Sequence, residues 1–170
     1  MSNSILDLQP ISCIRRNHGL EHATIHILSK THPSVKLGGM STPVGFTIIG
    51  DISAEEVAEA AIEALKKLRS GDAELAMHPN CGTNFAVSGA FAGLAAWIGM
   101  LGSGKEFKRK MERLPLAILL ATVALILTRP LGPLVQKRIT TTGNPGGMEL
   151  DRVETFLRAG VRMHHVVTRG

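Results

Sequence analysis

The sequence predicts an α+β fold in which a small α/β domain, formed by residues 1–84 and 136–170, carries an inserted transmembrane helical hairpin at residues 85–135. Two observations predict it. The 170 residues are 44% hydrophobic, and most of the apolar excess lies between residues 85 and 135. The flanking parts alternate helical and extended patterns, and a chain of this length is about one domain.

The N-terminal part begins with a predicted helix from Asn17, a favourable N-cap, to about Ser29. The helix must end before Pro33, because proline disfavours helical geometry in the residue before it. Residues 35–51 have turn glycines and prolines, and Phe46–Ile49 is typical of a half-buried strand.

A second helix is predicted from a capping box, Ser53 with Glu56, to about Arg69, followed by Gly71 as its C-terminal stop. Residues 74–77 are either a short strand or the entry to the next segment.

Two uncharged runs, Phe85–Leu101 and Leu114–Thr128, flank a basic linker at residues 102–113. Each is near the roughly 20 residues that span a bilayer, and we interpret them as a transmembrane hairpin. The alternative is a buried hairpin of a soluble protein. Gly89 and Gly93 have the spacing that lets helices approach closely in lipid, which predicts homo- or hetero-oligomers.

The C-terminal part returns to a polar composition. Residues 138–142 and 162–168 are predicted strands, and residues 151–157 are a short helix or strand. His164 and His165 are adjacent on the second strand and would point to opposite faces, so at most one reaches any given site.

The formal charge of +5, without interleaved aromatics or a nucleic-acid motif, fits an anionic lipid bilayer better than a nucleic acid, so we expect no nucleic-acid partner. By the positive-inside rule the basic linker favours a cytoplasmic hairpin loop, which would place both ends of the chain outside. Two observations oppose that orientation. Arg129, Lys137 and Arg138 put positive charge on the terminal side as well, and a folded N-terminal part of this size is rarely moved across a membrane without a signal. Cys13 and Cys81 form no disulfide framework, which favours a reducing compartment. We therefore expect an integral protein of the cell (inner) membrane with its α/β part in the cytoplasm, and no cleaved signal peptide.

The candidate chemistry lies in the predicted first helix, where His18, Glu21 and His22 form H-x-x-E-H. His18 and His22 are one turn apart on the same face, so both imidazoles can share a metal ion such as zinc. Glu21 is placed to act as a general base without being a ligand. His26 continues the same face.

Catalytic zinc takes three protein ligands, and His78 and Cys81 in H-P-N-C-G are the best candidates for the third. The alternative is that this turn only caps the following helix, with Cys81 as a small buried residue. Other candidates for the third ligand are the carboxylates of the second helix: Glu55, Glu56, Glu59 and Glu63.

The segment around H-G-L-E-H locally resembles the zinc-site helix of inverzincin (pitrilysin-type) metallopeptidases. That resemblance implies His18 and His22 as ligands and Glu21 as general base, but the chain is far shorter than that fold. Over its length, R-N-H-G-L-E-H-A, G-F-x-I-x-G and H-P-N-C-G-T-N resemble an uncharacterised family of small bacterial membrane proteins.

Two functions follow as hypotheses. The first is a membrane-anchored zinc-dependent peptidase acting on peptide or membrane-protein substrates near the bilayer surface. The second is a non-enzymatic membrane accessory subunit that packs on partner helices and holds a structural metal or none.

Overall fold

The computed structural model describes residues 4–170 and divides the chain into two compact units. The first, which we call the α/β unit, runs to His78 and resumes with Lys137–Gly170. The second, the hairpin unit, is Pro79–Gln136. The mixture of helices with an antiparallel sheet confirms the α+β class.

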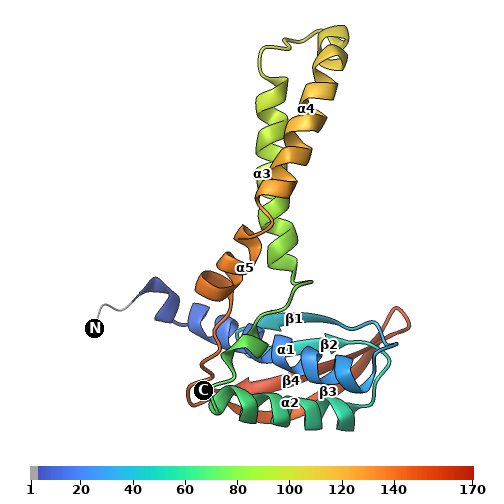
Figure 1. Cartoon of the computed structure of the whole chain (residues 1–170). Helices are drawn as coiled ribbons and strands as arrows, with labels where there is room; N and C mark the ends of the chain where they lie inside the picture. The colour runs from blue at the N-terminus through green and yellow to red at the C-terminus, as the bar shows by residue number, and fades with distance from the viewer. Residues whose placement is uncertain (1–3) are drawn as a thin grey trace. The chain divides into compact units, whose positions relative to one another are not determined.

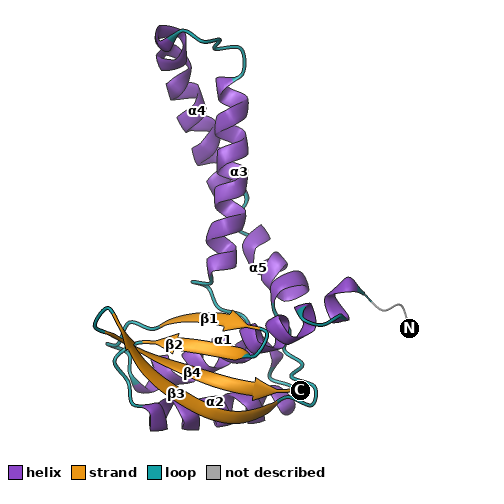
Figure 2. Ribbon diagram, turned by 180° about the vertical axis from the view of Figure 1, so that it is seen from behind, coloured by secondary structure: helices purple, strands orange, loops and turns teal. Residues whose placement is uncertain are grey.

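The α/β unit contains a four-stranded antiparallel sheet in the order β1-β2-β4-β3. The strands are β1 (Gly38–Thr42), β2 (Gly45–Ile49), β3 (Glu149–Arg158) and β4 (Val161–Arg169). The helices of this unit lie behind the sheet in Figure 2, so they cover only one of its faces. Alternation along the strands directs Phe46, Ile48 and Val166 to the covered face, where they are fully buried.

Helices α1 (Ile11–Thr31) and α2 (Ala54–Arg69) pack on that face. A short helix, η1 (Ile5–Asp7), precedes α1 in the chain. The predicted capping box is confirmed, because Ser53 and Glu56 each accept from the other's backbone N–H. Gly71 follows α2 at φ +99°, a conformation that favours glycine. The core is formed by one stripe of each helix and the inner sheet face, with Leu20, Ala23, Leu28, Val57, Ala61, Ala64 and Leu68 as its main helical members.

Two predicted elements are wrong, and a third is decided between its alternatives. α1 begins six residues before Asn17, which is buried inside the helix; its side chain donates to the Thr42 carbonyl and accepts from Thr168. Of the two alternatives for residues 74–77, the short strand is excluded, because the segment contains a short helix, η2 (Ala73–Ala76), on the way to the next element. The predicted strand at 138–142 is replaced by a helical turn, η3 (Gln136–Thr140), and a loop.

The hairpin unit consists of α3 (Gly82–Met100), α4 (Phe107–Leu127) and α5 (Leu131–Val135). α3 and α4 pack closely where Gly99 meets Ala117, since a Cβ on Gly99 would lie 2.8 Å from the Ala117 Cα. At Gly89 and Gly93 an added Cβ would meet nothing within 4 Å, so their face is not used within the hairpin.

By length and composition, α3 is the one described helix able to cross a membrane by itself. A second candidate span arises if α4 is joined to Leu131–Thr140 across a bend of 53°. Most large apolar side chains of α3 and α4 are exposed in this chain.

Candidate metal centre

The histidines of α1 form a stripe, because positions 18, 22 and 26 are successive helical turns. The ring centres of His18 and His22 are 4.4 Å apart, and one ring nitrogen of each lies within 4.8 Å of the other. With Zn–N bonds of about 2.0–2.1 Å, two ligands of a tetrahedral zinc have nitrogens roughly 3.4 Å apart. A small side-chain rotation would therefore bring both rings onto one ion.

Backbone carbonyls set the protonation of both rings. His18 Nδ1–H donates to the Thr140 carbonyl at 3.0 Å, and His22 Nδ1–H donates to the Ala76 carbonyl at 2.8 Å. A carbonyl only accepts, so each Nδ1 carries a proton, and in the neutral tautomer Nε2 has the lone pair that a metal ion would use. Histidine ligands are commonly oriented in this way, with the second ring nitrogen bonded to a carbonyl or carboxylate.

His78 extends the cluster from a different part of the chain. Its ring centre is 5.6 Å from that of His22 and 5.0 Å from that of His26. Burial, with smaller contributions from His26 and His22, lowers the pKa of His78 to about 4. At neutral pH the ring is therefore uncharged, as a metal ligand must be.

The segment before His78 is fixed on α1 by hydrogen bonds. His26 Nε2–H donates to the Met77 carbonyl at 2.7 Å, next to the bond from His22 to Ala76. Two histidines one turn apart thus hold consecutive carbonyls, and this delivers the His78 ring to the stripe.

Residues 138–142, which we call the C-terminal strap, lie against the start of α1. The Thr142 N–H donates to the Arg15 carbonyl at 3.2 Å, and the Arg15 guanidinium donates to the carbonyls of Arg138 and Thr141. Gly19 permits this approach, because a Cβ there would lie 2.2 Å from the Thr142 oxygen. The strap in turn supplies the Thr140 carbonyl that orients His18.

Glu21 is buried and points toward strand β1. The Ser41 hydroxyl donates to its carboxylate, and a Cβ on Gly39 would collide with the same group. Since successive residues of a helix are rotated by about 100°, Glu21 and His22 face different neighbours. The carboxylate is held by the sheet, whereas the imidazoles are held by η2 and the strap.

Cys81 belongs to the hairpin unit, where it is the N-cap of α3 and its sulfur accepts from the Thr83 N–H at 3.4 Å. Pro79 and Asn80 separate it from His78. Three residues of extended chain span at most about 10 Å, which is the largest separation that the backbone allows between Cys81 and His78.

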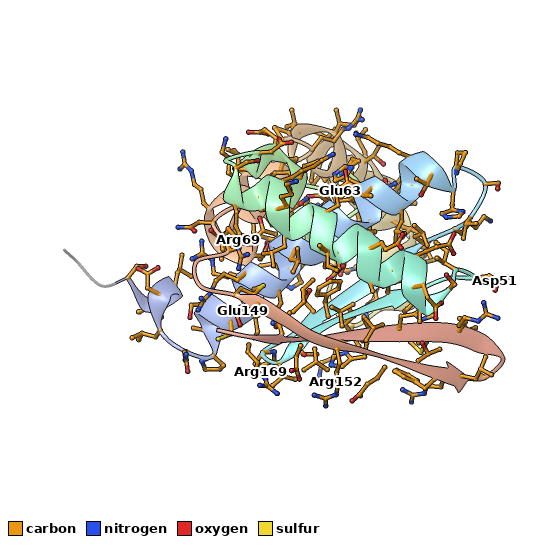
Figure 3. All side chains as sticks on the ribbon, turned by 90° about the horizontal axis from the view of Figure 1, so that it is seen from below. Asp51, Glu63, Arg69, Glu149, Arg152 and Arg169 are labelled. Atoms are coloured by element: carbon orange, nitrogen blue, oxygen red, sulfur yellow. The ribbon has the colours of Figure 1, made fainter. Side chains whose placement is uncertain are left out.

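The carboxylates of α2 are engaged elsewhere. Glu56 serves the capping box and contacts His32 at 3.0 Å, and Glu63, labelled on α2 in Figure 3, pairs with Lys67 at 2.7 Å. The Lys67 hydrogen bond lowers the pKa of Glu63. These pairings favour His78 and Cys81 over Glu56 and Glu63 as the third ligand.

His164 and His165 lie on opposite faces of β4, as predicted. His164 is buried: Nε2–H donates to the Ile52 carbonyl at 2.9 Å and Nδ1 accepts from Thr155. Burial lowers its pKa, and this ring is a neutral core residue. His165 bonds Thr47 on the other side of the sheet.

Sequence reasoning missed the groups that position the site, namely the Ala76, Met77 and Thr140 carbonyls and the Ser41 hydroxyl. Carbonyls carry no residue-type signal, and nothing around Ser41 in the sequence points to Glu21.

These features define a class of protein: an α/β unit with a histidine cluster on its first helix, joined to a helical hairpin. The chain belongs to the family described as Domain of unknown function (DUF6391), whose model matches residues 13–153. This supports the expected membership of an uncharacterised family.

One relative is an uncharacterized protein of Picosynechococcus sp., 36% identical over 104 residues. The match covers 54% of this chain and 51% of the relative, so it spans about half of each protein. No solved structure matches the chain.

Proposed function

We propose that this chain is a membrane-anchored, zinc-dependent hydrolase that cleaves peptide bonds near the bilayer surface. The observation that carries the proposal is the pair His18 and His22, with donor nitrogens within 4.8 Å and both Nδ1 protons bound by backbone carbonyls. A surface histidine pair has no need of such orientation, whereas metal ligands commonly have it.

His18 and His22 would bind the ion through Nε2, and His78 or Cys81 would supply the third ligand. Bound zinc would polarise a substrate carbonyl and lower the pKa of water. Glu21 would take a proton from the attacking water and pass it to the leaving amine. The Ser41 hydroxyl orients that carboxylate.

The proposed anchor is the hairpin unit, in the cell (inner) membrane with the α/β unit on the cytoplasmic side. It is supported by the length and composition of α3 and by the exposed apolar side chains of α3 and α4. An α-helix of 19 residues is about 28 Å long, close to the roughly 30 Å of a bilayer's hydrocarbon core.

A second candidate is a non-enzymatic accessory subunit with a structural metal or none. The position of Glu21 favours it, because a carboxylate bonded to Ser41 and packed on Gly39 is well suited to joining α1 to β1. Gly89 and Gly93 would provide the surface for partner helices, since among residues 4–170 nothing lies within 4 Å of a Cβ added at either position.

Metal analysis of the purified full chain tests the zinc site that the hydrolase requires. We expect about one zinc per chain, lost in His22→Ala and retained in the matched control His32→Ala, whose ring contacts Glu56 instead. Absence of stoichiometric metal after reconstitution with zinc would refute the hydrolase.

Activity is then measured on a library of quenched fluorescent peptides. Glu21→Gln should abolish cleavage while zinc stays bound. A zinc-loaded parent without activity on peptides or on membrane-protein substrates would instead identify the accessory subunit.

A further inference from the structure

The end of the hairpin where α3 connects to α4 carries a dense group of cations, which we call the basic tip. Its members are Lys105, Lys108, Arg109, Lys110 and Arg113. Two carboxylates, Glu106 and Glu112, leave the segment 105–113 with a net charge of +3. Figure 1 shows this connection at the opposite end of the hairpin from α5.

The cations of the basic tip do not stabilise the helix that bears them. Lys108, Arg109 and Lys110 occupy the first turn of α4, which contains no acidic residue, and the N-cap Glu106 makes no side-chain capping bond. The positive end of the helix dipole repels cations there. Glu106 offsets part of this repulsion by pairing with Arg109 at 3.1 Å. The arrangement therefore suits an anionic partner outside the chain.

Exposed apolar side chains lie among these charges. Phe107 is 75% exposed and Met111 is 44% exposed, one helical turn apart on α4. Trp97, near the end of α3, is 61% exposed. Aromatic rings at the end of an apolar helix, beside lysine and arginine, are typical of the membrane–water interface.

We propose that the basic tip, with Trp97, Phe107 and Met111, docks into the headgroup layer of a bilayer and selects anionic lipids. The cations contact lipid phosphates and carboxylates while the aromatic and thioether side chains enter the acyl boundary. This inference rests on the bilayer location of the hairpin in the proposed function, and is independent of the metal centre.

The test uses Trp97 as the reporter, because the sequence contains one tryptophan and no tyrosine. The full chain is reconstituted into vesicles of 70% phosphatidylcholine and 30% phosphatidylglycerol. Two vesicle preparations are compared, each containing brominated acyl chains, which quench tryptophan fluorescence on contact. In the first preparation the phosphatidylglycerol is brominated, and in the second an equal fraction of the phosphatidylcholine is brominated. Each cation near an anionic surface favours binding about fivefold, so we expect at least a fivefold preference for brominated phosphatidylglycerol as quencher.

Lys108→Gln/Arg109→Gln/Lys110→Gln should reduce this preference toward one. The control Lys30→Gln/Lys36→Gln/Arg158→Gln removes the same charge from exposed positions of the α/β unit and should leave it unchanged.

Equal quenching by both lipids, or an equal loss in both triple variants, would overturn the selectivity of the tip while leaving the hairpin in the bilayer. Absence of quenching by either lipid would overturn the membrane location itself.

Discussion

Replacing Gly19 by alanine tests whether the close approach of the C-terminal strap organises the histidine stripe. The new Cβ would lie 2.2 Å from the Thr142 oxygen and 3.2 Å from the Ala76 Cβ, so the strap must move by about 1 Å or more. Overpacking of this kind costs about 1–3 kcal/mol. The bonds from His18 to Thr140 and from Arg15 to Thr141 would weaken, each contributing about 0.5–1.5 kcal/mol.

Helix propensity acts in the opposite direction, because alanine is favoured over glycine by about 1 kcal/mol inside a helix. The net expectation is a loss of about 1–5 kcal/mol in the free energy of unfolding of the α/β unit, the upper end applying if both bonds are lost, with weaker zinc binding. Hydrogen exchange of the α1 amides measures this unit separately from the hairpin. Gly147→Ala is the control, since its Cβ would meet nothing within 4 Å and it should change stability by less than about 0.5 kcal/mol. An unchanged or more stable Gly19→Ala variant would refute the reasoning.

Three further predictions concern the helix cap, a buried histidine and the hairpin. Ser53→Ala should destabilise α2 by about 1 kcal/mol in hydrogen exchange, because it removes the hydroxyl that accepts from the Glu56 N–H and donates to the Glu56 carboxylate. Exposed Ser34→Ala should have no effect, and equal effects would contradict the capping role. Burial lowers the pKa of His164, so the stability that the neutral ring contributes is present above the unfolded pKa of about 6.5 and is lost as the pH falls below it. His164→Asn should therefore flatten the acid limb of a curve of unfolding free energy against pH. An unchanged limb would count against this. Gly99→Val should separate α3 from α4 and increase proteolysis of the hairpin in detergent, because a Cβ there would lie 2.8 Å from the Ala117 Cα. Gly93→Val is the matched control and should leave the hairpin intact. If partner helices pack at Gly93, the same control should reduce the yield of cross-linked oligomers.

The elements predicted most accurately are those whose signals are local. The capping box of Ser53 and Glu56 and the apolar stripe of α2 determine that helix through contacts within a few residues. The β-branched and aromatic residues of Phe46–Ile49 likewise predicted β2. The strand is buried at residues 45–48, so it is not half-buried as the sequence predicted.

The predicted start of α1 is wrong because the side chain of Asn17 was expected to cap the helix, whereas the helix begins at Ile11. In the folded chain it bridges Thr42 and Thr168, residues 25 and 151 positions away. Residues 138–142 were expected to form a strand for a related reason: their carbonyls accept from Arg15 and His18 rather than from another strand.

The sequence by itself determined that three histidines share one face of α1, because helical periodicity fixes that, and that two apolar runs flank a basic linker. Only the tertiary structure decided what surrounds the histidines. The Ala76 and Thr140 carbonyls reach His22 and His18 from segments 54 and 122 residues away, and His78 joins them from a turn with no local reason to fold onto α1. Backbone carbonyls are the same in every residue, so their positions follow from the packing of the whole unit.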